Sequence, residues 1–380
     1  MKLIHIADPH LGYRAYNRIT PGGLNAREAD VFAAFRGALD KAATLEPDLV
    51  LIAGDLFHTV RPSNLIVNYS YRQFAAFRKK CSAPIVIIGG NHDTPRSADT
   101  GCILDLLDNL PDVYVVHSEY QQVKLDRLDT SVFCLCHRAL PQLSSLKIEP
   151  DPESKYNILM AHGTVQGIAR HAYDLYEISR SQVINDEWDY IAFGHYHVFE
   201  QLAPNAFYAG SLEYTSNNIW METKHDKGFI EYNFEERRIV AFHKVKTREV
   251  VDLRPIDAQG VSADQINRMI LQRLESIPGG HVNKIVRLVV ENIPRSVQAD
   301  LDFAMIRVIR SEALHFELQL RPPGKEIALG QLSYRLGAPK PLEDEWQEFA
   351  EAYNIPGGVD RDRFLALGRE YIMKQAQIEE

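Results

Sequence analysis

Five short clusters of Asp, Asn and His are spread over the first half of this 380-residue chain. They contain Asp8 and His10, Asp55 and His58, Asn91 and His92, His162, and His195 and His197. Carboxylate and amide oxygens mixed with imidazole nitrogens suit manganese, iron or zinc better than calcium or magnesium alone. If the five clusters converge, they supply enough ligands for two divalent ions, and such a pair of ions cleaves phosphoesters.

Each cluster follows an apolar, β-prone run, so each is expected where a strand ends. The five runs read KLIHIA, LVLIA, PIVIIG, YNILM and DYIAF. Amphipathic helices are predicted at about 26–45 and 63–80, and strands dominate after His162. Loops at the carboxyl ends of strands hold the sites of open α/β sheets. The pattern predicts an α/β sandwich of two sheets with the site along one edge.

Every cluster taken alone has a structural alternative. A single histidine such as His5 or His162 is commonly a packed core residue, and Asp8 or Asp55 alone commonly belongs to a turn. The position that all five clusters share at strand ends favours a metal site over these alternatives.

The order D-x-H, G-D-x-x-H, G-N-H-D, H, G-H-x-H resembles the calcineurin-like metallophosphoesterases. Within that group, ADPHLGY, IAGDLFHTVRPS, GGNHD, FGHYH and YAGSLE are similar to the SbcD-type nuclease subunits of bacterial break-repair complexes. The resemblance is strong over the first two-thirds of the chain and is mostly a matter of layout over the rest. It implies a calcineurin-like fold with two divalent ions, and Mn²⁺ is the ion we expect.

The resemblance also implies which residue binds which ion. Asp55 bridges the two ions, a role that a carboxylate fills best because it can face both. One ion takes Asp8, His10 and His197, and the other takes Asn91, His162 and His195. The spacing of the last motif agrees with this, since His195 and His197 are two residues apart and share one side of an extended segment.

Two histidines of these clusters remain for chemistry. His92 follows the ligand Asn91, and its pKa range suits protonation of a leaving 3′ oxygen. The resemblance makes His58 a residue that orients the phosphate or His92. The alternative for His58 is a supporting residue without a chemical role. We expect Asp93 to be a carboxylate that holds a histidine in one tautomer.

Basic and aromatic residues follow two of the ligand loops. They are Arg14, Tyr16, Asn17 and Arg18 after the first loop and Arg61 after the second. Such side chains beside a phosphate site suit contact with the DNA backbone. A solvated surface loop is the alternative for each of them.

Composition and pattern divide the chain into four parts. Residues 1–247 form the predicted metallophosphoesterase (nuclease) domain, and 248–320 form a small α+β module that resembles the cap domain of SbcD-type nucleases. Residues 321–341 are a linker rich in Pro and Gly. Residues 342–380 are predicted to form two short helices, split by Pro356-Gly357-Gly358, that bind a partner.

The composition is that of an ordinary globular protein, with 45% hydrophobic and 24% charged residues. The start of the chain does not resemble a signal peptide, and no apolar run reaches the length of a membrane span. The four cysteines lack zinc-site spacing, so a reducing cytoplasm is the simpler location. The net charge is −9, but −6 of it lies between Leu342 and Glu380. Charge alone argues weakly against tight non-specific binding of DNA, although bound cations would offset it at the site.

The resemblance implies a Mn²⁺-dependent DNA nuclease with 3′-to-5′ exonuclease and endonuclease action. The expected partner is a coiled-coil ABC-type ATPase, SbcC, which residues 342–380 would bind. We also expect a homodimer through the helices near Leu65–Phe77 and Ile103–Leu107. One alternative is a phosphatase or cyclic-nucleotide phosphodiesterase, which the string GDLFH and the additional module disfavour. The other is a catalytically silent assembly protein, which seven intact ligand positions disfavour.

Overall fold

The computed structural model describes residues 1–95, 101–168, 176–323, 346, 350 and 360–376. Residues 1–323 form one unit and residues 324–380 a second. In the second unit the described helix is α8 (Arg361–Ala376). The finer boundaries at residues 247 and 320 stay a prediction.

The first sheet has the strand order β14-β13-β1-β2-β3-β4. Its strands are β1 (Lys2–Ile6), β2 (Leu49–Ala53), β3 (Ile85–Ile88), β4 (Val113–Val116), β13 (Gly228–Asn233) and β14 (Arg238–Lys244). Strands β1 to β4 run parallel to one another, whereas β13 is antiparallel to both β1 and β14. Every residue of β2 is buried because both faces of this sheet are covered, which explains its unbroken apolar sequence.

The second sheet has the strand order β11-β12-β10-β7-β6-β5. Its strands are β5 (Tyr120–Leu125), β6 (Thr130–Leu135), β7 (Tyr156–His162), β10 (Tyr190–Gly194), β11 (Glu200–Ala203) and β12 (Ala206–Tyr208). The central strands β6, β7, β10 and β12 are parallel. In β7 and β10 the carboxyl ends therefore lie at the same edge, next to each other in register.

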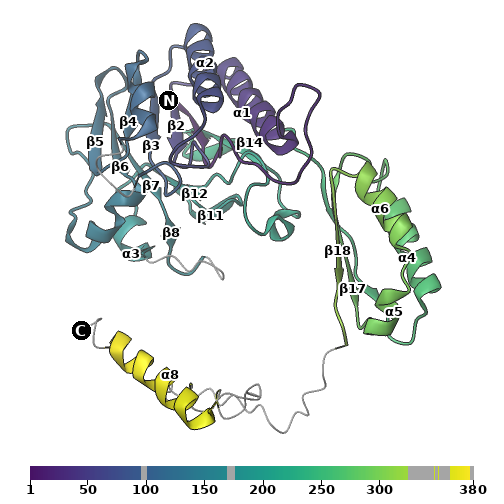
Figure 1. Ribbon diagram of the computed structural model, residues 1–380. Coiled ribbons are helices and arrows are strands. Elements are labelled where there is room, and N and C mark those ends of the chain that lie inside the picture. The colour runs from purple at the N-terminus through teal and green to yellow at the C-terminus, as the bar shows by residue number, and fades with distance from the viewer. Residues whose placement is uncertain (96–100, 169–175, 324–345, 347–349, 351–359, 377–380) are drawn as a thin grey trace. The chain divides into compact units, whose positions relative to one another are not determined.

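Side chains that alternate along the strands form three apolar layers. Leu3, Leu51 and Ile158 belong to the layer between the two sheets. Ile4 and Ile52 face the helices α1 (Ala26–Thr44) and α2 (Asn64–Lys80) and the 3₁₀ helix η2 (Ile103–Asn109). Figure 1 shows α1 and α2 side by side on that face. The outer face of the second sheet packs against the 3₁₀ helix η4 (His137–Ser145).

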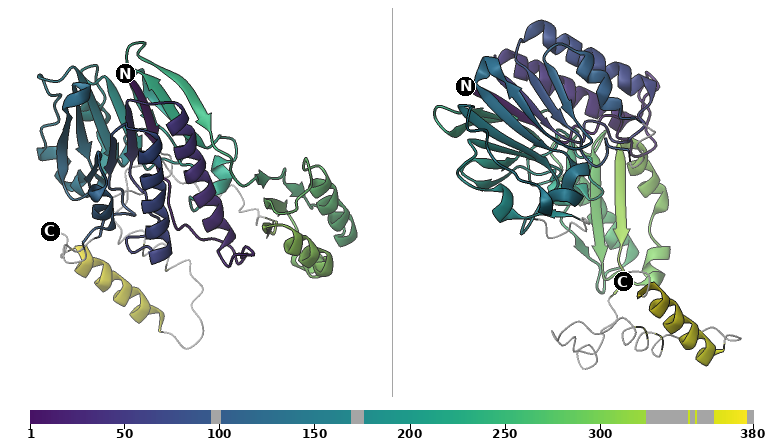
Figure 2. Two further views of the ribbon diagram at one scale, coloured as in Figure 1. Left: turned by 90° about the horizontal axis from the view of Figure 1, so that it is seen from above. Right: turned by 90° about the vertical axis from the view of Figure 1, so that its left-hand side faces the viewer.

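A third, parallel sheet lies later in the chain, with β17 (Ile285–Glu291) at its centre. Its other strands are β15 (Val250–Asp252), β16 (Ile256–Asp257) and β18 (His315–Leu320). The helices α4 (Ala263–Glu275), α5 (Arg295–Ala299) and α6 (Phe303–Glu312) cover one face of it, as Figure 2 shows. We call residues 250–320 the cap module.

Short elements complete the first unit. They are η3 (Asp126–Leu128), β8 (Thr164–Val165), β9 (Glu177–Ile178), α3 (Arg180–Val183) and η5 (Ile219–Glu222).

The predicted α/β sandwich of two sheets is confirmed, and α1 and α2 begin and end within a residue of the predicted bounds. In the later sheet region, α6 begins at Phe303 because Asp302 caps it: the carboxylate accepts the N–H of Met305. Of the first predicted tail helix, residues 346 and 350 are described and the others lie outside the described residues. Within the described residues, no helix is both long enough and apolar enough to span a membrane.

Candidate metal centre

The five clusters lie at the carboxyl ends of five parallel strands, as the sequence predicts. Asp8 follows β1, Asp55 follows β2, and Asn91 follows β3. His162 is the last residue of β7, and His195 follows β10. Neighbouring parallel strands bring these ends together in each sheet, and the sandwich brings the two sets face to face.

Hydrogen bonds to main-chain carbonyls tie the ligand loops to one another. Asp8 N–H donates to Gly54 O over 3.2 Å, and His10 N–H donates to Asp55 O over 2.9 Å. Across the sheets, His162 Nδ1 donates to Ala53 O over 2.9 Å, which leaves its Nε2 for the site. These bonds fix the positions of the ligand loops relative to one another.

Four site residues have a left-handed backbone. Asp8, His10 and Asp55 have φ of 49° and His195 has φ of 98°. Residues other than glycine rarely adopt such angles, and where they persist the surrounding structure over-determines them. Such strain concentrates at functional sites.

The first group of metal-ligating atoms comes from Asp8, His10 and His197, whose atoms lie within 4.8 Å of one another. His10 Nε2 and His197 Nε2 are 3.0 Å apart. Both oxygens of Asp8 accept the N–H of His195, at 2.9 and 3.0 Å. This bond ties the first group to the backbone of a residue in the second.

The second group comes from Asp55, His162 and His195, again within 4.8 Å of one another. The amide oxygen of Asn91 lies 3.1 Å from His162 Nε2 and 3.0 Å from His195 Nδ1. All four side chains therefore converge on one small volume.

The carboxylate of Asp55 lies close to histidines of both groups of metal-ligating atoms. Its Oδ2 lies 3.6 Å from His10 Nε2 in the first group and 3.4 Å from His162 Nε2 in the second. A ligand that bridges two ions needs such a position. The assignment of individual residues to individual ions stays a prediction.

Burial sets the charge of these groups. It lowers the pKa of His10 to about 3 and that of His197 well below its usual range, so both rings are neutral. Burial raises the pKa of Asp8 to about 8. Burial also acts to raise the pKa of Asp55, but the charge of His162 outweighs it and holds that pKa well below its usual range.

This donor set fits divalent metal ions. Neutral imidazoles carry the lone pairs that metals bind. The buried Nδ1 of His197 has no hydrogen-bond partner among the described residues, and the nearest carboxylate oxygen, on Glu222, is 3.9 Å away. The neutral rings of His10 and His197 cannot offset the charge of a buried carboxylate, and bound divalent ions would do so.

His92 is held beside the ligands by two bonds. Its N–H donates to Asp55 Oδ1 over 2.9 Å, and its Nδ1 donates to His58 O over 2.9 Å. The His58 and His92 rings are stacked with centroids 5.2 Å apart. Because Nδ1 is engaged with a carbonyl, Nε2 is the ring nitrogen of His92 that stays available. His58 supports His92 through its main chain.

The expectation that Asp93 holds a histidine is wrong in this structure. Its carboxylate accepts the backbone N–H groups of Leu56, Phe57 and Gly90, at 2.8 to 3.1 Å. Asp93 therefore braces the loop that carries Asp55. Burial raises its pKa to about 7.

Three of the residues predicted to contact DNA have partners within the chain. Arg14 pairs with the buried Glu28 at 2.9 Å, and Tyr16 stacks on His315 with centroids 4.0 Å apart. Arg18 donates to three carbonyls at the end of α6, among them Ala313 O at 3.0 Å. Asn17 and Arg61 are exposed. Contact with DNA stays a prediction for all five.

Sequence reasoning missed two residues that support the centre. The ring of His137 lies 6.3 Å from that of His162 and 6.4 Å from that of His195. It comes just after β6 and its apolar run, so the rule that finds the other clusters also applies to it. The buried Lys227 donates to His197 O over 2.6 Å and pairs with Glu222. No local pattern marks that lysine.

Residues 1–199 match the family model described as calcineurin-like phosphoesterase. The chain belongs to this family. Its members are metallophosphoesterases, so the family implies divalent metal ions, in agreement with the clusters of His and Asp.

Several curated proteins are similar to the chain. The DNA double-strand break repair protein Mre11 of Methanococcus maripaludis is 29% identical over 60% of this chain and 62% of its own length. Mre11 of Methanocaldococcus jannaschii is 28% identical over 71% of this chain and 73% of its own. The SbcD component of the SbcCD nuclease of Staphylococcus saprophyticus is 25% identical over 72% and 75%. The chain thus spans about three fifths of the first of these relatives.

Gly90 allows Asp55 to occupy its place, since a Cβ there would lie 2.1 Å from Asp55 Oδ1 and 2.5 Å from Asp55 N. We expect Gly90→Ala to push Asp55 away and to weaken binding of Mn²⁺ by about 10–100-fold, as loss of a ligand's support does. Titration calorimetry of the metal-free chain measures this.

Gly37→Ala is the matched control, because its Cβ would meet no atom within 4 Å on the surface of α1. It should bind metal as the wild type does. Circular dichroism should show that both variants are folded. Unchanged metal affinity in a folded Gly90→Ala variant would contradict the role given to Asp55.

Proposed function

We propose that the chain is a metal-dependent DNA nuclease that acts in double-strand-break processing and hairpin cleavage, with 3′-to-5′ exonuclease and single-strand endonuclease action. The observation that carries the proposal is the position of Asp55 between two groups of donors with His92 bonded to it. Similarity to break-repair proteins over more than the phosphoesterase region supports DNA as the substrate.

We propose Mn²⁺ as the ion, two per chain, because the donors mix carboxylate, amide and imidazole. Asp8, His10 and His197 would hold one ion and Asn91, His162 and His195 the other, with Asp55 shared. Such ions polarise the phosphate and lower the pKa of a bound water to supply the nucleophile.

The chain's own residues would then control the leaving group. His92 Nε2 would give a proton to the 3′ oxygen as the P–O bond breaks. The carbonyl of His58 keeps the other nitrogen of that ring protonated, so the ring presents a fixed face. The buried Lys227 fixes the main chain of His197.

A phosphatase or cyclic-nucleotide phosphodiesterase is the alternative. The cap module argues against it, since Tyr16 and Arg18 fasten that module to the loop beside the ligands. A small substrate would need no such extension of the site.

Labelled linear duplex DNA and a chromogenic phosphomonoester, each with Mn²⁺, separate the two functions. We expect nucleotides to be released from the duplex and little phosphomonoester to be cleaved.

His92→Ala should keep its metals and lose about 10²–10⁴-fold in DNA cleavage, the usual contribution of a general acid. His281→Ala removes an imidazole of the cap module that pairs with Glu312, and should cleave as the wild type does. Cleavage by His92→Ala within a few-fold of wild type would remove His92 from the mechanism.

We also propose a homodimer formed through α2 and η2. Leu65 on α2 is 51% exposed. Leu106 on η2 is 39% exposed and lines a groove together with Val67 and Tyr71 of α2. Apolar side chains in that setting suit a self-complementary interface.

Leu65→Glu should weaken the dimer at least about a hundredfold, because an interface cannot cheaply bury an unpaired carboxylate. Sedimentation velocity at micromolar concentration measures this. Leu271→Glu on α4, a residue 40% exposed, should leave the dimer intact. A wild-type chain that sediments as a monomer would refute the dimer.

We propose the cytoplasm as the location, because a reducing compartment suits the four free, buried cysteines.

We also propose that residues 342–380 bind the coiled-coil ATPase SbcC. α8 presents Phe364 to Trp346, with ring centroids 5.4 Å apart, while Leu367 is 45% exposed. An apolar side chain left uncovered on a helix suits docking in a partner's groove.

Deleting the residues after Pro341 should abolish SbcC binding and leave cleavage of short DNA by the isolated chain unchanged. A pull-down with purified SbcC and a cleavage assay measure the two effects. Full affinity of the truncated chain for SbcC would show that the tail is not the binding element.

A further inference from the structure

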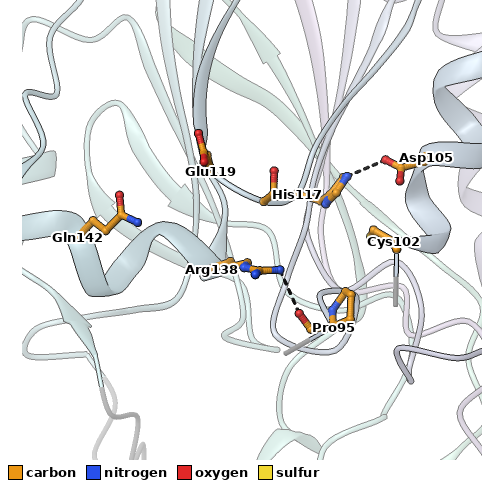
Figure 3. Close-up of a pocket in the computed structure, with 9 residues that line it drawn as sticks. Pro95, Cys102, Asp105, His117, Glu119, Arg138 and Gln142 are labelled. Carbon is orange, nitrogen blue, oxygen red and sulfur yellow. Dashed lines mark hydrogen bonds and ion pairs between the residues drawn. The ribbon is translucent and has the colours of Figure 1, made fainter. Parts of the chain in front are cut away.

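A pocket of about 440 Å³ opens beside the metal centre and has no role in the site described above. Its walls come from separate segments, as the labelled residues of Figure 3 show: Pro95, Cys102 just before η2, His117 after β4, and Arg138 in η4. Its lining includes Pro95, Cys102, His117, Glu119, Arg138 and Gln142. Its volume lies in the range of small-ligand sites.

Both sides of the pocket adjoin residues that contact the ligands or their loops. Arg138 directly follows His137, whose ring stands against those of His162 and His195. On the other side, Cys102 Sγ contacts Asp93 O at 3.6 Å, and Asp93 braces the loop of Asp55. A polymer held at the metal centre would therefore have its next unit at this pocket.

Arg138 supplies a positive charge that is available to a ligand. Its Nη1 donates to Pro95 O over 3.1 Å, which fixes the guanidinium across the pocket. Among the described residues it has no carboxylate partner, and its remaining N–H groups make no bond there. A planar guanidinium held in this way suits a phosphate, which it can bind with two parallel hydrogen bonds.

The rest of the lining suits a nucleoside. The ring of His117 is fixed by its bond to Asp105 at 2.6 Å, and Pro95 and Cys102 add apolar surface. Bases stack on histidine rings and on apolar surface in nucleic-acid sites. The carboxylate of Glu119 at the rim repels phosphate, so the phosphate of a bound nucleotide belongs on the side of Arg138.

We propose that this pocket binds the nucleotide next to the scissile phosphodiester, with Arg138 on the neighbouring phosphate and the base against His117. The proposal rests on the nuclease function and adds a subsite to it. A free deoxynucleoside monophosphate has the same chemistry and would occupy the same place as a product.

Two substrates test the subsite: a short single-stranded oligonucleotide and bis-p-nitrophenyl phosphate, a diester without a nucleoside. Arg138→Gln should lower kcat/KM on the oligonucleotide about 10–100-fold, the usual weight of a hydrogen bond to a charged group, chiefly through KM. Cleavage of the small diester should change less than about twofold, since it has no neighbouring phosphate to lose. Arg138→Lys should have an intermediate kcat/KM because lysine keeps the positive charge but lacks the planar guanidinium that donates two parallel hydrogen bonds.

Arg127→Gln is the matched control, since Arg127 is an exposed arginine paired with Asp112 at 3.0 Å. It should leave both substrates unaffected. Calorimetry with deoxyadenosine monophosphate, without metal, should show binding that Arg138→Gln loses.

The outcomes separate the two proposals. A wild-type chain that cleaves the small diester but no DNA refutes the nuclease function, whatever Arg138 does. A wild type that cleaves DNA alongside an Arg138→Gln variant of equal kcat/KM refutes the subsite alone. An equal loss on both substrates would also refute it, because Arg138 would then act through the metal centre.

Discussion

The centre depends on a close approach of backbones that three glycines permit. A Cβ on Gly194 would lie 1.7 Å from Ala53 O, one on Gly54 would lie 2.1 Å from His162 Nδ1, and one on Gly90 would meet Asp55. Strand ends of the two sheets therefore touch, and the carboxylate of Asp55 lies where both sets of donors reach it. Larger side chains would separate the sheets by the width of a methyl group or more, and the donors would no longer converge.

The same crowding links the centre to the cap module. The segment between His10 and α1 carries a ligand at one end and, a few residues on, stacks Tyr16 on His315 and places Arg18 on the last carbonyls of α6. A second connection runs from His197 through Lys227 to Glu222 in η5, where Trp220 packs against Arg287 of β17 at 4.8 Å. A shift of the cap module would thus act directly on segments that bear His10 and His197.

Local sequence signals make the positions of the ligands predictable. The roles of other site residues depend on contacts with distant parts of the chain, which the sequence does not show. An apolar run followed by Asp or His is visible within ten residues, and parallel pairing brings such ends together without further information. The partners of Arg18 lie almost three hundred residues away, so its charge alone suggests DNA instead of the carbonyls of α6. The prediction for Asp93 fails for a similar reason, because two of the donors to its carboxylate, Leu56 and Phe57, belong to another loop.

The proposed binding of a polyanion by an acidic chain requires a local source of positive charge at the centre. Burial raises the pKa of Asp8 to about 8 and keeps His10 and His197 neutral, so those three groups by themselves offer a phosphate no positive charge. Bound divalent cations would supply that positive charge at short range, whatever the net charge of −9 of the whole chain. A metal centre and the neighbouring Arg138 would together give the phosphate backbone two successive points of attachment. Few basic residues are then needed on the remaining surface to position a DNA strand. Fixed charges close to the scissile bond act on it with little screening by salt.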